Sequence, residues 1–124
     1  MSQSYDLGIK GESLAAEHLR TLGMKIMETR WRDHSYETDI IAFDPTTDEM
    51  VFVEVKTRAS GHWGAPEEAI TPMKIRRLVA SANHYMRMHN DWHNVRFDVF
   101  SIIIPPEGTT HIDYYRDAFY APLR

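Results

Sequence analysis

Residues 51–58 read VFVEVKTR, a strand-like hydrophobic run in which Glu54 and Lys56 stand at positions where a buried strand would have no charge. Side chains of a β-strand alternate between its two faces, so the three valines share one face. Glu54 and Lys56 then lie on the other face, beside Phe52. Charged groups are depleted in strands and are costly in apolar surroundings unless they are paired or bound to metal. The stretch is therefore either an amphipathic strand with its charged face in water or the wall of a functional site.

Composition favours one folded domain over residues 1–124, because 43% of the residues are hydrophobic and 26% are charged. No run approaches the roughly 20 apolar residues of a membrane helix, and MSQSYDLG lacks a signal-peptide core, so we expect a cytoplasmic protein without membrane association. The absence of cysteine excludes disulfides and thiolate zinc sites. A net charge of −4 argues against a protein that simply coats nucleic acid, although a local basic surface is compatible with it.

Two helices are predicted from hydrophobic periodicity and end signals. The first begins near Asp6 and ends at Gly23, and we expect Gly8 and Gly11 in its first turns to permit close approach of another backbone. The second covers residues 72–89, with an N-cap and a first-position proline supplied by the pair TP at 71–72.

Five strands complete the prediction. They cover residues 24–31, 37–43, 50–56, 94–104 and 111–119. The polar stretch RDHSY (32–36) connects the first two, and DPTTDE (44–49) has the composition of a turn. Helix, three strands, helix and two strands indicate an α/β or α+β layer fold.

The apolar faces of strands 37–43 and 50–56 fix how the two strands pair. When these faces coincide, Glu37, Asp39, Glu54 and Lys56 fall together on the other side of the sheet. A four-residue loop over 45–48 sets Asp39 directly opposite Glu54, with Cβ atoms about 4.5–5.5 Å apart. Two carboxylates at that distance repel unless a proton or a cation lies between them, and a hard ion such as Mg²⁺ suits such a pair.

Several other features have two interpretations. His89 and His93 have the i, i+4 spacing of a zinc pair, but no His-Glu-x-x-His motif occurs, and we interpret them as surface histidines. Trp63 either stacks on an unpaired base or packs against the domain. Arg96 and Asp98, which flank a phenylalanine on a strand, are interpreted as an internal ion pair.

Asp39, followed after fourteen residues by Glu54-Val55-Lys56, resembles the Asp…(Asp/Glu)-x-Lys core of restriction-endonuclease-like nucleases. Around this core the following stretches occur in order: GESLAAEHLRTLG, ETDIIA, VFVEVKTR, GAPEEAITPMKIRRL, RFDVFSI and HIDYYRDAF. Together they resemble the YraN family of small bacterial proteins, which is similar to archaeal Holliday-junction resolvases. The resemblance covers residues 7–120 and implies a restriction endonuclease-like core, in which helices flank a central mixed β-sheet.

The resemblance also implies a divalent-metal site. Asp39 and Glu54 would be ligands of Mg²⁺ or Mn²⁺, helped by the carbonyl of Val55, and Glu12 near the start of the first helix would complete the set. Lys56 would orient or deprotonate the attacking water, or stabilise the pentacovalent phosphate.

Other positions match the family less completely. Glu37 matches the Glu of the family's Gly-Glu-Ile-Asp, in which Gly is replaced here by Tyr36 and Ile by Thr38. The family's Asn-x-Arg appears as Arg-Trp-Arg at 30–32, which keeps the second basic residue and loses the Asn. Contacts with nucleic acid are expected from a basic set, unless its helical members merely form a solvated face. This set is Arg32, Arg58, Lys74, Arg76 and Arg77.

Two functions follow from these patterns. The first is a metal-dependent nuclease acting on branched or single-stranded DNA in repair or recombination, and intact Asp39, Glu54 and Lys56 favour it. The second is a non-catalytic nucleic-acid-binding module that assists a DNA-processing partner, which the acidic balance and the altered segments 30–32 and 36–39 favour. Either protein could act as a homodimer.

Overall fold

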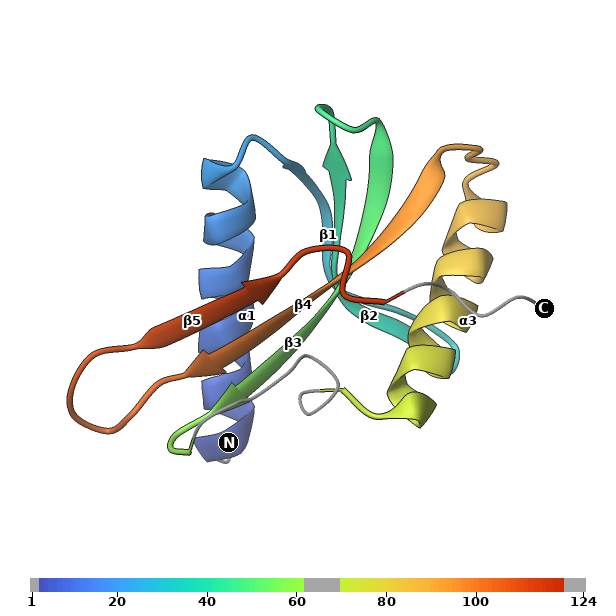
Figure 1. Cartoon of the computed structure of the whole chain (residues 1–124). Coiled ribbons are helices and arrows are strands. Elements are labelled where there is room, and N and C mark those ends of the chain that lie inside the picture. Colours follow the sequence, from blue (N-terminus) through green and yellow to red (C-terminus); the bar gives the residue numbers. More distant parts are fainter. Residues whose placement is uncertain (1–2, 62–69, 120–124) are drawn as a thin grey trace.

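Five β-strands and two helices form the part of the chain that the computed structural model describes, residues 3–61 and 70–119. The elements are α1 (Gln3–Thr21), β1 (Lys25–Asp33), β2 (Tyr36–Asp44), β3 (Glu49–Arg58), α3 (Pro72–Met88), β4 (Asn94–Ile103) and β5 (His111–Tyr115). The strands lie side by side in the order β1-β2-β3-β4-β5, with α1 on one face of the sheet and α3 on the other (Figure 1). Neither described helix has the length and apolar character required to cross a membrane.

The sheet is mixed, as expected. Neighbouring strands are antiparallel except β3 and β4, which are parallel and therefore need the long crossover that contains α3. In the β2–β3 hairpin, Ile40 pairs with Val53 and Ala42 with Val51, which confirms the pairing of the apolar faces. The α+β fold is compatible with a restriction endonuclease-like core.

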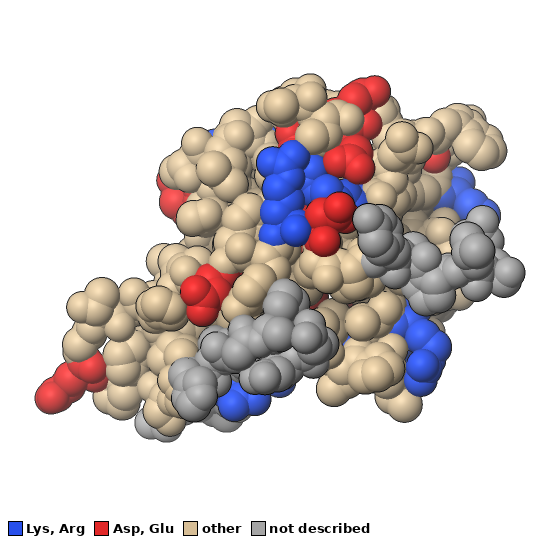
Figure 2. All heavy atoms as spheres, in the orientation of Figure 1, with Lys and Arg blue, Asp and Glu red and all other residues tan. Residues whose placement is uncertain are grey.

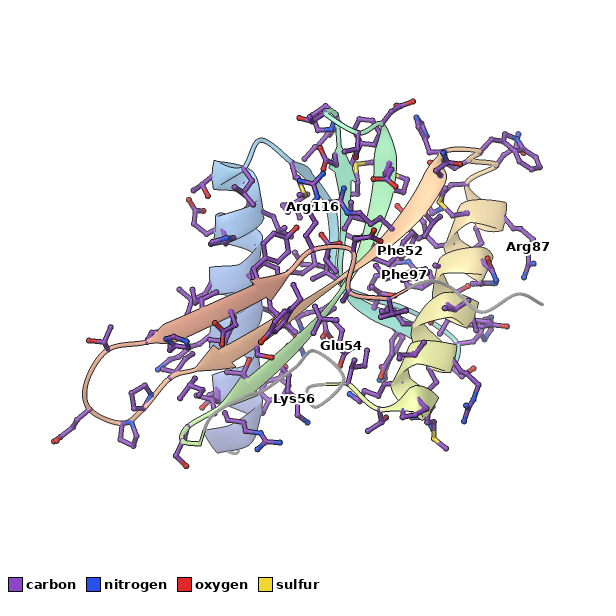
Figure 3. The ribbon with its side chains drawn as sticks, viewed as in Figure 1. Phe52, Glu54, Lys56, Arg87, Phe97 and Arg116 are labelled. Carbon is purple, nitrogen blue, oxygen red and sulfur yellow. The ribbon has the colours of Figure 1, made fainter. Side chains whose placement is uncertain are left out.

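Each face of the sheet has its own hydrophobic core. The core under α1 is formed mainly by Ala15, Leu19, Ile40, Ala42, Val51, Val53, Phe100 and Ile102. The core under α3 is formed mainly by Ile41, Phe52, Leu78, Ala82, Tyr85, Met86, Phe97 and Val99. Phe52 and Phe97 lie between the sheet and α3 in Figure 3. Burial on both faces fixes the strand register, because a one-residue slip would move each hydrophobic set to the wrong side.

The helix ends follow the predicted signals. Gly23 has a φ of 89° and closes α1, and the N–H of Met24 donates to the carbonyl of Leu19 at 3.1 Å in a Schellman arrangement. The side chain of Thr71 caps α3 by accepting from the N–H of Lys74 at 3.2 Å. The prediction for the start of α1 was too late, since the helix begins at Gln3. Glu12 therefore lies in the middle of α1 and not near its start.

Of the two glycines in α1, only Gly11 makes a close approach. A Cβ placed at Gly11 would lie 1.9 Å from Oγ1 of Thr57 on β3, whereas nothing lies within 4 Å of the same position at Gly8. The approach is to a side chain, so the expectation of a backbone contact at both glycines was wrong. Gly11 allows α1 to lie directly on β3.

The predicted strands differ from the observed ones at two places. β1 continues to Asp33, which pairs with Tyr36 across the two-residue turn His34-Ser35, so Arg32 and Asp33 belong to a hairpin and not to a polar connection. β5 ends at Tyr115, four residues earlier than expected. The residues beyond it turn back, and the N–H of Ala118 donates to the carbonyl of Phe97.

A buried charge network lies at the turn end of the β2–β3 hairpin. The guanidinium of Arg96, whose side chain is 3% exposed, donates to Asp44 at 2.9 Å, to Glu49 at 3.0 Å and to Asp98 at 3.0 Å. Asp98, which is fully buried, also accepts from the hydroxyl of Tyr114. The predicted internal ion pair of Arg96 and Asp98 is confirmed and belongs to a larger set that satisfies each buried charge.

The contact at Gly11 gives a test of the packing. Gly11→Ala should lower the free energy of unfolding by about 1–3 kcal/mol, because the methyl group overlaps Thr57, a short branched side chain that cannot move aside. Gly8→Ala is the matched control and should raise it by about 0.5–1 kcal/mol, since alanine is the better helix former and the space is open. Urea unfolding measures both; equal effects at the two positions would contradict the close packing.

Candidate functional site

The β2–β3 hairpin opens at the end opposite its turn. Strand pairing runs from Asp44 and Glu49 to Ile40 and Val53, and the same register places Asp39 level with the next residue of β3. There the carboxylate of Asp39 takes the place of a strand carbonyl and accepts from the N–H of Val55 at 2.8 Å. Because a strand N–H lies in the plane of the sheet, the Asp39 carboxylate sits between the two strands.

Asp39 is the most perturbed acid of the site. Burial raises its pKa first, and the nearby carboxylates of Glu54 and Glu12 raise it further, so that the pKa reaches about 8 although the Val55 N–H and Lys74 act in the opposite direction. Near neutral pH the Asp39 carboxyl therefore holds a proton, and its position is one that a cation would also stabilise.

Glu12 approaches Asp39 from α1. Burial raises the pKa of Glu12, while Arg30 and a side-chain hydrogen bond with Asp39 lower it. The guanidinium of Arg30 donates to Glu12 at 3.2 Å and to the hydroxyl of Tyr5 at 3.3 Å, and it also lies over the Tyr5 ring, 5.1 Å from the ring centre. One carboxylate of the site is thus already paired with a cation of the chain.

Glu54 is paired in the same way from the α3 side. Its carboxylate accepts from the ammonium of Lys74 at 3.0 Å, and the Glu54 charge is the main reason that the pKa of Lys74 is raised. Lys74, expected to meet a phosphate, instead holds one of the expected metal ligands. Lys56 lies beyond Glu54 toward the carboxyl end of β3 (Figure 3), is partly buried and forms no ion pair with any residue that the structure describes.

The expected site residues line two neighbouring hollows. One, of about 370 Å³, lies between β2, β3 and α3 and is lined by Glu54, Lys74 and Arg77 among others. The other, of about 470 Å³, is bounded by α1, β1 and β2 and is lined by residues that include Glu12, Arg30 and Asp39. Glu37 lines both hollows. The acids predicted to share one cavity are therefore divided between two openings that adjoin at Glu37.

The remaining basic candidates lie at the surface. Arg32 is ion-paired with Glu37 at 2.7 Å, and Arg58, Arg76 and Arg77 are exposed. Arg87, also on α3, projects away from the sheet (Figure 3). On the face shown in Figure 2, acidic and basic side chains are interspersed and form no continuous basic surface. Trp63, for which base stacking and packing against the domain were both considered, lies outside the described residues.

The histidine pair does not form a zinc site. The His89 ring stacks on Tyr85 with 4.0 Å between ring centres, and His93 bonds to Asp91 at 2.7 Å. Within residues 3–61 and 70–119, no three His, Cys, Asp or Glu side chains are grouped closely enough to hold a metal ion. Glu12 and Glu54 each face a basic side chain in this arrangement.

Two residues of the site were not selected from the sequence. Arg30 has a φ of 51°, a left-handed conformation that a sequence does not reveal for arginine. Thr29 and Arg30 both line a further hollow between α1 and β1, while Trp31 packs on Tyr85 of α3. Thr38, which is 3% exposed, lines the hollow of Asp39, and its buried hydroxyl has no hydrogen-bond partner in the part of the chain that the structure describes.

Known proteins resemble the chain along nearly all of its length. A family model described as "Uncharacterised protein family UPF0102" matches residues 11–102, which contain Glu12, Asp39 and Glu54. A UPF0102 protein of Parabacteroides distasonis is 44% identical over 124 residues, the whole of both chains. A UPF0102 protein of Rhodococcus opacus is 42% identical over 120 residues, 96% of this chain and 100% of the relative. One of Porphyromonas gingivalis is 41% identical over 120 residues, 96% of this chain and 87% of the relative. The chain therefore belongs to the UPF0102 (YraN) family.

Proposed function

We propose that the chain is a cytoplasmic, metal-dependent nuclease that hydrolyses phosphodiester bonds of branched or single-stranded DNA. The proposal rests on the Asp39 carboxyl, which is fixed between β2 and β3. Two nearby carboxylates, those of Glu54 and Glu12, raise its pKa. A group that is costly to ionise has no structural use at this position, since a serine or an asparagine would satisfy the Val55 N–H as well.

The donor atoms of the site suit a divalent cation, although Glu12 and Glu54 would have to leave Arg30 and Lys74 to gather around it. Carboxylate and carbonyl oxygens are the donors that Mg²⁺ and Mn²⁺ prefer, and the repulsion that raises the Asp39 pKa is relieved by a positive charge. Asp39, Glu54 and the Val55 carbonyl would hold the ion, with Glu12 completing the set. When bound, the ion would stabilise the charge that develops on the phosphate and activate a water molecule.

Lys56 supplies the remaining chemistry from β3. It follows Glu54 by two residues and therefore faces the same side of the strand. From there its amino group can hold the attacking water or donate a hydrogen bond to a phosphate oxygen. Lys74 is placed to neutralise Glu54 when no cation is bound and to face the substrate when one is.

The exposed arginines of α3 have a different role. Arg76 and Arg77 are exposed on α3, and Arg77 lines the same opening as Glu54. Contacts with the phosphate backbone from there would position DNA without reading its sequence. A homodimer, which would bring two such sites to the strands of a branched structure, stays a prediction.

Metal binding should depend on pH through Asp39. Mn²⁺ affinity should rise as the pH passes through about 8, because below this pH a proton occupies the Asp39 carboxyl and the metal must displace it. Asp39→Asn should weaken binding by about 100-fold and remove this pH dependence, given that even an outer-shell partner costs about 10- to 100-fold. Isothermal titration calorimetry measures both effects. Asp48→Asn, an exposed turn residue, is the control and should bind as the wild type does; equal affinities of all three proteins would exclude the site.

Lys56 and the arginines of α3 should separate chemistry from docking. Lys56→Ala should abolish Mn²⁺-dependent cleavage and leave the DNA affinity within about three-fold of the wild type. The double variant Arg76→Ala, Arg77→Ala should weaken DNA binding and flatten its salt dependence by about one slope unit per lost phosphate contact. Gel assays on branched, single-stranded and duplex DNA, with fluorescence anisotropy across a salt series, test this.

Lys10→Ala, which removes an exposed charge from α1, is the control for both measurements. A wild type that binds these DNAs and never cuts any of them would replace the nuclease with the binding module.

A further inference from the structure

Arg30 occupies a position that suits arginine poorly. Its φ of 51° lies in the left-handed region, where residues other than glycine, asparagine and aspartate are disfavoured. Such conformations persist where surrounding contacts impose them, and they concentrate at functional sites. The conformation turns the Arg30 side chain toward α1, into the hollow that also contains Asp39.

The contacts of Arg30 are few and replaceable. Its guanidinium bonds to Glu12 at 3.2 Å and to the hydroxyl of Tyr5 at 3.3 Å, and the Arg30 side chain remains 45% exposed while that of Glu12 is 17% exposed. A guanidinium has five N–H donors in a planar fork, so these bonds leave further donors facing the hollow. The partner that matters is Glu12, the acid that would complete the metal site.

Thr38, which also lines this hollow, has a buried hydroxyl. Among residues 3–61 and 70–119 the Thr38 hydroxyl has no hydrogen-bond partner, although Thr38 is only 3% exposed, and such a group normally costs stability unless a ligand or water satisfies it. Arg32 lines the same hollow. Both guanidinium groups are paired with carboxylates of the same hollow, Arg30 with Glu12 and Arg32 with Glu37. A phosphate, whose oxygens accept hydrogen bonds and carry negative charge, would match these donors in place of a carboxylate.

We propose that Arg30 binds the phosphodiester anion of the substrate. In the absence of metal the guanidinium of Arg30 is paired with Glu12, and it would become available to the phosphodiester when a divalent cation binds the Glu12 carboxylate. This inference rests on the proposed function. When the cation binds Glu12, the Arg30 charge loses its acceptor and faces the hollow, where a phosphate oxygen replaces the carboxylate. Cation and phosphodiester should therefore bind cooperatively, each raising the affinity for the other by the same factor.

Arg30→Asn tests the exchange without disturbing the backbone, because asparagine tolerates the left-handed conformation. The melting temperature should stay the same or rise. Calorimetric titrations of Mn²⁺ are run with and without saturating diethyl phosphate, a phosphodiester monoanion without bases. Diethyl phosphate should raise the Mn²⁺ affinity of the wild type by about five-fold or more. In Arg30→Asn, Mn²⁺ alone should bind about two- to five-fold more tightly, as expected on removal of a part-exposed ion pair, and the cooperative factor should fall toward one.

Two further variants make the result specific. Arg20→Gln removes a charge from α1 near the same surface, where Arg20 pairs with Glu17, and it should leave both quantities unchanged. Thr38→Val should leave the fold as stable as before or more stable, because it removes an unpaired hydroxyl, but it should lower the affinity of the Mn²⁺-loaded protein for diethyl phosphate.

The outcomes separate this inference from the nuclease proposal. Unchanged cooperativity in Arg30→Asn, or Mn²⁺ binding that weakens when the arginine is removed, overturns the role of Arg30 even if the wild type cleaves DNA. Cooperativity that depends on Arg30 in a protein that cuts no DNA structure supports the anion site and rejects the nuclease.

Discussion

The contact of α1 with β3 at Gly11 is the constraint on which the arrangement of the site depends. Gly11 has no side chain, so the helix lies against Thr57 at a distance that any Cβ would prevent. Glu12 is the next residue of the helix, and the same approach brings its carboxylate to Asp39. A helix held farther from the sheet would leave the hairpin acids without their third member. One missing methyl group thus links the packing of the α1 core to the electrostatics of the site.

The site balances its acids with bases of its own chain. Arg30 pairs with Glu12, Lys74 pairs with Glu54, and Asp39 between them keeps a proton. Unpaired charges in partly buried positions would cost more than the fold can offset, so this arrangement lets the protein fold before any ligand arrives. A cation that enters the site therefore competes with Arg30 for Glu12 and with Lys74 for Glu54.

Sequence patterns predicted the sheet better than they predicted the pairs within the site. The alternation of VFVEVKTR and ETDIIAF was enough to bring Asp39 level with Glu54, because two buried faces permit only one register. The partners of these acids come from elsewhere. Lys74 reaches Glu54 through a crossover whose direction no local pattern records, and Arg30 reaches Glu12 through a backbone angle that its residue type disfavours. The helix also begins three residues earlier than predicted, which places Glu12 in its middle.

The Arg96 network distinguishes the two ends of the β2–β3 hairpin. Arg96 bonds to Asp44 and Glu49, the two residues that flank the turn, and through Asp98 to the last strand and the segment that follows it. The turn end of the hairpin is therefore held by the ion pairs of Arg96. Breaking them would leave buried charges without partners. The other end of the hairpin is joined across the strands only by a side chain, Asp39. The acids therefore lie at the end of the β2–β3 pair that has fewer bonds between the two strands, while β1 and β4 hold the outer edges of both strands there.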